Sequence, residues 1–158
     1  MKIFEPFVPA DVRARVDALE LPWNRYDLDP YGVSKRDLAV FFTALEPIYR
    51  QYFDVRVHGR ENVPRAGRSM LVGNHSGGIA LDAMMVFASC FFELDPPRLA
   101  QGMVEKFIHR LPGASQLFTR AGQFMGLPEH ARRLLDEERL LMVFPEGARG
   151  TAKLASES

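Results

Sequence analysis

Apolar residues recur at helical spacing between positions 35 and 52, and they predict the strongest helix of the chain. Ser34 with Asp37 three residues later has the sequence of a capping box, which predicts where the helix begins. Pro47 predicts a kink or a break. A helix face this rich in aromatic residues either packs on a sheet or inserts at a lipid surface. The pattern favours packing on a sheet. The apolar positions are Leu38, Phe41, Phe42, Leu45, Ile48, Tyr49 and Tyr52.

The rest of the chain alternates between short apolar runs and segments of helical character. Strands are expected at 54–58, 69–73, 98–103, 122–126 and 140–144, and further helices near 10–19, 82–92, 105–110, 114–121 and 128–139. Such alternation predicts an α/β domain with a mainly parallel or mixed central sheet that is flanked by helices. We expect residues 1–32 to form an N-terminal arm with one short helix and residues 33–158 to form the main domain. In the arm, Trp23, Tyr26 and Tyr31 are expected to pin a loop to the domain.

The amino-acid composition and the net charge exclude some classes of protein. The chain has 158 residues, of which 47% are hydrophobic and 25% are charged, and this mix excludes a disordered chain. The formal net charge is zero, so a nucleic-acid partner has no electrostatic support. The one cysteine, Cys90, cannot form an internal disulfide and reads as a small buried hydrophobe. We therefore expect a reducing compartment.

Membrane-spanning and secretory signals are not visible in the sequence. The longest uncharged apolar run, Ala83 to Phe92, has ten residues, whereas a spanning helix needs about 18 or more. The N-terminus has no apolar core of a signal peptide. The expectation is a protein that is soluble or peripheral to a membrane.

Candidate chemistry first appears directly after the expected strand 69–73, in the sequence Asn-His-Ser-Gly-Gly-Ile-Ala-Leu-Asp. A histidine at the end of a buried strand lies where open α/β sheets place their sites. His75 can take a proton from a hydroxyl, and Asp82 can hold its ring by a hydrogen bond. Gly77 and Gly78 would let a ligand approach the backbone closely. Alternatively, His75 is an ordinary turn histidine and Asp82 caps a helix.

A second block, Phe-Pro-Glu-Gly-Ala-Arg, follows the expected strand 140–144. Arg149 can hold a phosphate by paired hydrogen bonds, and Glu146 can bind a hydroxyl or orient Arg149. Taken alone, the block also fits a surface turn with an ion pair. A serine or thioester hydrolase is disfavoured because the chain has no Gly-x-Ser-x-Gly elbow. A metal site is disfavoured because no histidine has paired ligand spacing.

Together, the two blocks resemble those of the glycerolipid acyltransferases, the PlsC-type or lysophosphatidate acyltransferase family. That family has a His-x4-Asp block and, some 70 residues later, a Phe-Pro-Glu-Gly-Thr-Arg block. Here His75 and Glu146 are 71 positions apart. The resemblance covers about residues 55–154 and implies a glycerol-phosphate acyltransferase-like α/β fold resting on a membrane surface.

The resemblance also implies an activity, the transfer of a fatty acyl group to a glycerolipid hydroxyl. The donor would be acyl-CoA or acyl carrier protein, used as a co-substrate, and no cofactor is expected. His75 would be the general base, Asp82 would orient it, and Glu146 and Arg149 would help to bind substrate. The protein would lie at the cytoplasmic face of a membrane, with the lipid surface and the acyl donor as its partners. The remaining expected substrate-binding residues are Asn74, Ser76, Gly77, Gly78 and Gly147.

Three departures from the family pattern qualify this expectation. Six residues, not four, separate His75 from Asp82. The middle block, residues 122–128, lacks the arginine that contacts the acceptor phosphate in the family, so a neutral glyceride or another hydroxylated lipid becomes a more open alternative to a phosphorylated acceptor. Arg132 and Arg133, on a helix nearby, either substitute for that arginine or lie on a solvated helix face. The sequence stops soon after the second block, before the family's fourth block. This predicts a domain incomplete at its C-terminal end, and its alternative function is an inactive fragment that at most binds lipid or acyl donor.

Overall fold

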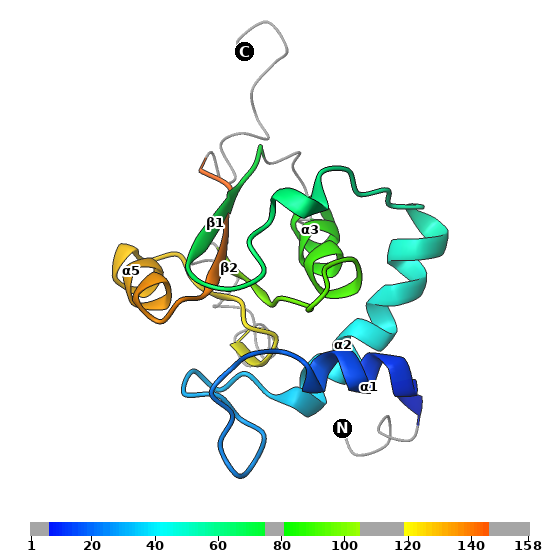
Figure 1. Ribbon diagram of the computed structural model, residues 1–158, viewed down its shortest axis with the longest axis horizontal. Coiled ribbons are helices and arrows are strands. Elements are labelled where there is room, and N and C mark those ends of the chain that lie inside the picture. The colour runs from blue at the N-terminus through cyan, green and yellow to red at the C-terminus, as the bar shows by residue number, and fades with distance from the viewer. Residues whose placement is uncertain (1–6, 75–80, 105–118, 146–158) are drawn as a thin grey trace, which may run out of the picture.

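A small parallel sheet lies at the centre of the computed structural model, which describes residues 7–74, 81–104 and 119–145 (Figure 1). Its strand order is β1-β4-β2-β3, and every neighbouring pair is parallel. The strands are β1 (Ser69–Val72), β2 (Ala100–Val104), β3 (Phe124–Met125) and β4 (Leu140–Val143). Four of the five expected strands are therefore confirmed, and so is the α/β class.

The two apolar runs that read alike in sequence occupy different places in the sheet. In β4, which lies between two neighbours, Leu140, Leu141 and Met142 are all buried. Among the described strands, β1 lies at the edge of the sheet, and the exposure of its side chains alternates, with Met70 46% and Val72 63% exposed. Burial on both faces is typical of an interior parallel strand, whereas the edge strand keeps one face open.

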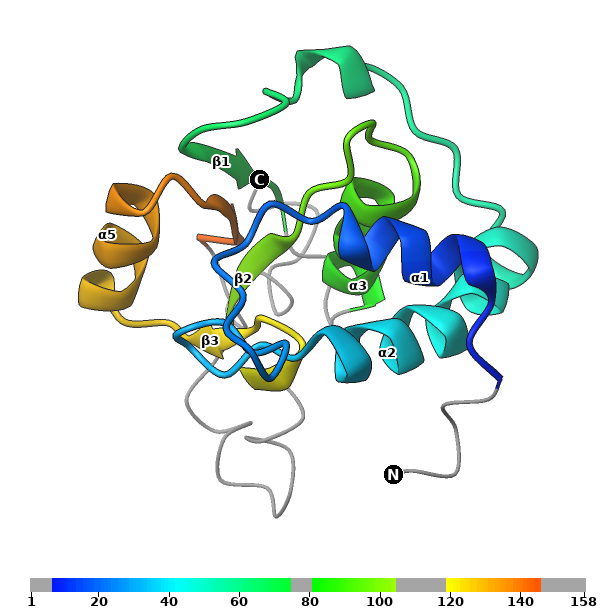
Figure 2. The ribbon, with the colours of Figure 1, turned by 60° about the horizontal axis from the view of Figure 1, so that its bottom comes forward.

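Helices cover both faces of the sheet. α5 (Pro128–Asp136) lies on one side, and α1 (Ala10–Asp17), α2 (Lys35–Pro47) and α3 (Leu81–Phe92) lie on the other (Figures 1 and 2). Leu134 of α5 is buried, while α3 contributes Phe87, Phe91 and Phe92 to the core. A three-layer arrangement of this kind buries a parallel sheet on both sides.

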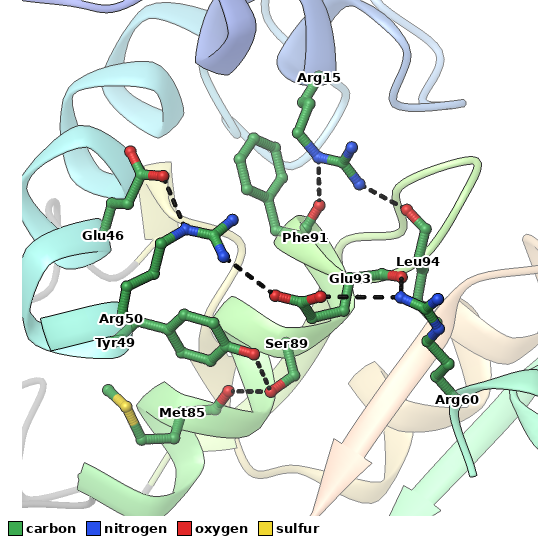
Figure 3. Close-up of polar contacts among 10 residues, drawn as sticks. All are labelled: Arg15, Glu46, Tyr49, Arg50, Arg60, Met85, Ser89, Phe91, Glu93 and Leu94. Atoms are coloured by element: carbon green, nitrogen blue, oxygen red, sulfur yellow. Dashed lines mark hydrogen bonds and ion pairs between the residues drawn. The ribbon is translucent and has the colours of Figure 1, made fainter. Parts of the chain in front are cut away.

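Aromatic packing joins α2 to α3. The rings of Phe42 and Phe91 stack with centroids 3.6 Å apart and an interplanar angle of 5°. The Tyr49 hydroxyl lies 3.2 Å from the Ser89 hydroxyl, as Figure 3 shows. Leu38 and Phe42 of α2, and Tyr49 in the turn that follows it, are thus part of the core, where they are at most 1% exposed. Its alternative use, insertion into lipid, is excluded for these side chains.

The N-terminal helix is fixed to the end of α3. Val12 and Val16 of α1 are buried in the same core as α2 and α3, at 0% and 2% exposure. The Arg15 guanidinium donates from Nε to the Phe91 carbonyl at 2.7 Å, and from its terminal nitrogen to the Leu94 carbonyl (Figure 3). These bonds satisfy carbonyls that the end of a helix leaves without partners.

α2 begins and ends close to the expected positions, with two differences in detail. The Ser34 hydroxyl accepts from the Asp37 amide at 3.3 Å, but the Asp37 carboxylate pairs with Arg120 at 3.0 Å instead of completing the capping box. After Pro47 the chain continues as a π-helical turn, η2 (Ile48–Tyr52). Proline lacks the amide that the α pattern needs, so the expected break takes this form.

Several expectations are wrong or fall elsewhere. Residues 54–58 join no strand of the described structure and lead into a 3-10 turn, η3 (Arg60–Asn62), because no neighbouring strand lies beside them. Of the three aromatic residues expected to fix the loop, Trp23 and Tyr31 pack against the core. Tyr26 is 66% exposed and does not. The expected helix 105–110 lies outside the described residues, as does most of the helix 114–121.

Within the described residues, none of the helices combines the length and the apolar character needed to cross a bilayer.

Candidate active site

The two chemistry-bearing blocks begin at neighbouring points of one sheet edge. β1 and β4 pair in parallel with Val72 opposite Val143, their last residues. The ladder continues one step further, because the Gly73 amide donates to the Val143 carbonyl at 3.2 Å. The chain therefore leaves the sheet toward His75 and toward Glu146 from adjacent strands, on the carboxyl side where α/β folds bind ligands.

Gly73 allows a close approach at this point. A Cβ at position 73 would lie 3.2 Å from the Phe144 ring, a tighter contact than a side chain normally tolerates. The missing side chain lets the Phe144 ring lie against the backbone of β1. The sequence carries no direct sign of this contact, although a glycine at a strand end is a general signal of close packing.

Of the expected site residues, the structure describes Asn74 and Asp82. Asn74 follows β1 and is exposed. Asp82 lies in the first turn of α3, is partly buried, and accepts a hydrogen bond from the Ala83 amide at 2.8 Å. A carboxylate in the first turn of a helix is stabilised in its charged form by the helix dipole. The other expected residues, His75, Ser76, Gly77, Gly78, Glu146, Gly147 and Arg149, lie outside the described residues.

The middle block is positioned by a side chain that the sequence did not single out. The amide of Gln123, just before β3, bridges two backbone groups of β2: its oxygen accepts from the Gly102 amide at 3.1 Å, and its nitrogen donates to the Ala100 carbonyl at 3.4 Å. A Cβ at position 102 would lie 2.1 Å from the Gln123 oxygen, so the contact requires glycine. Gln123 thus extends the short ladder between β2 and β3. An isolated glycine inside a strand pattern was the available signal.

The arginines near the middle block differ in what they contact. Arg133 lies in the last turn of α5, where it pairs with Glu137 at 3.5 Å and its guanidinium lies 5.1 Å from the centroid of the Tyr31 ring. These contacts are at the end of α5 that leads into the start of β4, away from the carboxyl edge. Arg132 is exposed on the same helix. The geometry therefore gives Arg133 no part at the candidate site.

The side chains at the opposite, amino edge of the sheet have structural contacts. A cavity of about 50 Å³ there is lined by residues that include Arg98, Arg139 and Leu140. Arg98 donates to the Pro64 and Gly67 carbonyls at 2.8 and 2.6 Å, and to the Ser69 hydroxyl at 2.9 Å. Its contacts anchor the loop before β1, so this cavity is remote from the candidate chemistry.

Cys90 is unsuited to act as a nucleophile. Its side chain is buried in α3, and this burial raises the pKa of the thiol to about 12. The thiol is thus protonated at neutral pH, as expected for a small core residue. Within the described parts of the chain, no three His, Cys, Asp or Glu side chains gather as metal ligands would.

Comparison with known proteins agrees with this arrangement. The model of the acyltransferase family matches residues 54–155. The chain is 30% identical over 129 residues, 81% of its length, to uncharacterized proteins of Mycobacterium tuberculosis, Mycobacterium bovis and Mycobacterium leprae. It spans about a third of their length, 36% in the first two and 35% in the third. No solved structure matches it significantly. The chain belongs to the acyltransferase family.

Proposed function

We propose that the protein transfers a fatty acyl group from acyl-CoA, or from acyl carrier protein, to a hydroxyl of a lysophospholipid or another glycerolipid. One observation carries the proposal: the segments with His75 and Glu146 leave the sheet from adjacent parallel strands, in register, at its carboxyl edge. In sequence these are the two blocks that acyl transfer needs, a base and a substrate-binding pair. The family match supports the reaction class.

The chemical step assigns a role to each side chain. His75 takes the proton of the acceptor hydroxyl as its oxygen attacks the thioester carbonyl. The carbon–sulfur bond then breaks, the new ester forms, and the proton passes from the imidazolium to the thiolate, which leaves as free thiol. Asp82 holds the imidazole in the required tautomer and stabilises its charged form.

Substrate binding is assigned to the second block and to the turn that follows β1. Arg149 would hold a phosphate of donor or acceptor, and Glu146 would bind a hydroxyl or orient Arg149. Asn74, which follows β1 and is exposed, would contact the acceptor. Peripheral association with a membrane surface follows from a lipid acceptor, and it belongs to the same proposal.

The experiment follows the acyl group itself. The chain is incubated with isotope-labelled palmitoyl-CoA and, separately, with lysophosphatidate, a neutral lysophospholipid, glycerol phosphate or diacylglycerol presented in vesicles. Lipid products are identified by mass spectrometry. We expect a labelled ester with at least one acceptor, and its formation should be lost in His75→Ala.

The matched control is His130→Ala, which removes a histidine of α5 that belongs to neither block. This variant should make the ester at the wild-type rate. Free palmitate without ester would indicate a hydrolase and contradict the proposal. Binding of acyl-CoA without any product, equal in wild type and His75→Ala, would assign the chain to non-catalytic lipid binding instead.

A further inference from the structure

Four segments that are far apart in sequence converge on the cavity at the amino edge of the sheet. They are residues 19–21 after α1, 65–67 before β1, 96–99 before β2 and 138–140 at the start of β4. The cavity has a volume of about 50 Å³. One buried water needs only about 10–15 Å³ of such space, so the cavity has room for a ligand larger than a single water molecule.

Arg98 lines this cavity as a buried cation without an ionic partner. It is 9% exposed, and it forms no ion pair within the described parts of the chain. Its hydrogen bonds go to two backbone carbonyls and one hydroxyl, all of them uncharged. They take up at most three of the five N–H groups of the guanidinium, and the Nε–H is among those that remain. A buried charge of this kind is costly unless a counter-ion compensates it.

Two further arginines line the same cavity. Arg65 is exposed and has no ion pair with any described residue. Arg139 is 5% exposed, and its Nη2 pairs with Asp29 at 3.4 Å. The Nη1 of Arg139 is buried and has no hydrogen-bond partner. Three guanidinium groups around one small cavity, with N–H groups to spare, favour an anion inside it.

Two carboxylates also line the cavity, but they do not balance these charges. Glu138 is taken up by Arg68, which donates to it from the backbone amide at 2.9 Å and from Nε at 2.8 Å. Glu20 has no ion pair among the described residues. Burial lowers the pKa of Arg98, and Glu20 is the one carboxylate whose charge acts against this shift. Arg65 and Arg98 therefore share a single uncommitted carboxylate, which leaves one positive charge uncompensated.

We propose that this cavity binds a phosphate group, either of inorganic phosphate or of a small phosphate monoester. Arg98 donates to it from Nε, and Arg65 and Arg139 supply further positive charge. Arginine suits this ligand because its planar fork matches the oxygens of a phosphate. The cavity shares four lining residues with a hollow of about 480 Å³, where the organic part of a monoester has room. Because glutamates line that hollow, it disfavours a ligand with a second negative group.

The test is isothermal titration calorimetry of the full chain with inorganic phosphate and, separately, with glycerol phosphate, at constant ionic strength. We expect saturable binding of phosphate. Arg65→Ala and Arg98→Lys should each weaken it at least about tenfold, because each removes charge-assisted hydrogen bonds. Glu20→Gln should tighten it severalfold, because it removes the competing carboxylate. Tighter binding of glycerol phosphate would identify a monoester as the ligand, and tighter binding of inorganic phosphate would identify the free ion.

Two arginine variants serve as controls. Arg56→Ala removes an exposed arginine that does not line the cavity, and Arg149→Ala removes the arginine assigned above to substrate. Both should retain the binding that depends on Arg65. Thermal unfolding without phosphate shows which variants fold. If Arg98→Lys does not, Arg65→Ala decides, because the Arg65 side chain is exposed and unpaired among the described residues.

Three results would overturn the proposal. The first is a wild type that binds neither compound saturably. The second is binding that Arg65→Ala leaves unchanged. The third is binding that Arg149→Ala abolishes, which would place the phosphate at the candidate active site instead of the amino edge. None of the three depends on whether the chain transfers acyl groups.

Discussion

The two edges of the parallel sheet are built from different interactions. At the amino edge, buried charged side chains fasten loops to strands: Arg98 binds the loop before β1, and Arg139 of the β4 entry pairs with Asp29 of the N-terminal arm at 3.4 Å. At the carboxyl edge, the described contacts are a backbone bond from Gly73 and the approach of the Phe144 ring. Our proposal assigns the chemistry to the polar side chains that follow this edge in sequence.

With the proposed function, this difference predicts that stability and activity depend on opposite edges of the sheet. The Asp29 and Arg139 side chains are 0% and 5% exposed, so breaking their pair removes the buried partner of a buried charge and leaves Arg139 only the more exposed Glu137, at 3.7 Å. Asn74, by contrast, is exposed, and its replacement leaves no buried group unsatisfied. Variants at the amino edge should therefore change the free energy of unfolding, and variants beyond the carboxyl edge should change the rate.

The largest effect is expected beyond the carboxyl edge. His75→Ala should lower the rate of acyl transfer by about 10²- to 10⁴-fold, because it removes the general base. Asp82→Ala in the same molecule should add little, since an orienting residue has nothing left to orient. Initial rates of ester formation for the two single variants and the double variant check this, with unchanged thermal unfolding. If the rate loss of the double variant equalled the product of the two single-variant losses, the pairing of His75 with Asp82 would be contradicted.

At the amino edge, Asp29→Ala should lower the free energy of unfolding by about 3–5 kcal/mol, because the buried Arg139 loses its buried carboxylate partner and keeps only Glu137, at 3.7 Å. Asp29 also accepts from the amides of Tyr31 and Val33, both at 2.8 Å, through Oδ1. Asp29→Asn keeps that acceptor and should lose less. Urea unfolding measures both, and the rate per folded molecule should match the wild type. A rate loss in folded Asp29→Asn would break the separation of the two edges.

The middle of the sheet gives an intermediate effect. Gly102→Ala places a methyl group 2.1 Å from the Gln123 oxygen, which should cost about 1–3 kcal/mol of unfolding free energy. In a Gln123→Ala background the same substitution should cost less, because the oxygen is gone. The residual cost reports the Met142 methyl, which would lie 3.1 Å from the added methyl group. Urea unfolding of the wild type, the two single variants and the double variant gives the coupling energy between positions 102 and 123. Purely additive losses of unfolding free energy would show that Gln123 does not bridge β2.

The smallest effect is expected at an exposed pair of the amino edge. The Arg68 backbone amide, and then its guanidinium, hold the pKa of Glu138 below its usual range. A lowered folded pKa contributes stability above the unfolded pKa, near 4.5, and this contribution is lost as pH falls through the folded value. Arg68→Ala keeps the amide bond and removes the guanidinium, so stability at neutral pH should fall slightly and the loss on acidification should shrink by the same small amount. Thermal unfolding between about pH 3 and 7 tests this; an unchanged acid slope would contradict it.

Periodicity predicted the helices and the strands that carry a buried face. The positions that make up the cores of α2 and α3 can be read from spacing alone, because a face that must be buried leaves a regular pattern in the sequence. The order of the strands is a different matter. β4 lies between β1 and β2, and nothing in its four residues tells an interior strand from one at the edge.

Residues 54–58 show where the pattern misled. Their alternation is real, since exposure alternates in the structure too, but a strand also needs a neighbour that supplies hydrogen bonds. The roles of Gln123 and Asp29 could not be predicted either, because their partners are remote in sequence. At the candidate site, the motifs identified the residue types. The structure shows in addition that β1 and β4, the strands that precede the two blocks, end side by side. The roles of His75 and Glu146 stay predictions.

The most direct test of the account is the release of free thiol from palmitoyl-CoA, measured with an acceptor lipid and without it, for wild type and His75→Ala. Cys90 adds little to the thiol signal, because burial raises the pKa of its thiol to about 12. The account predicts acceptor-dependent release by the wild type, loss of that release in His75→Ala, and the same thermal unfolding for both proteins. Equal release by the two folded proteins would contradict it.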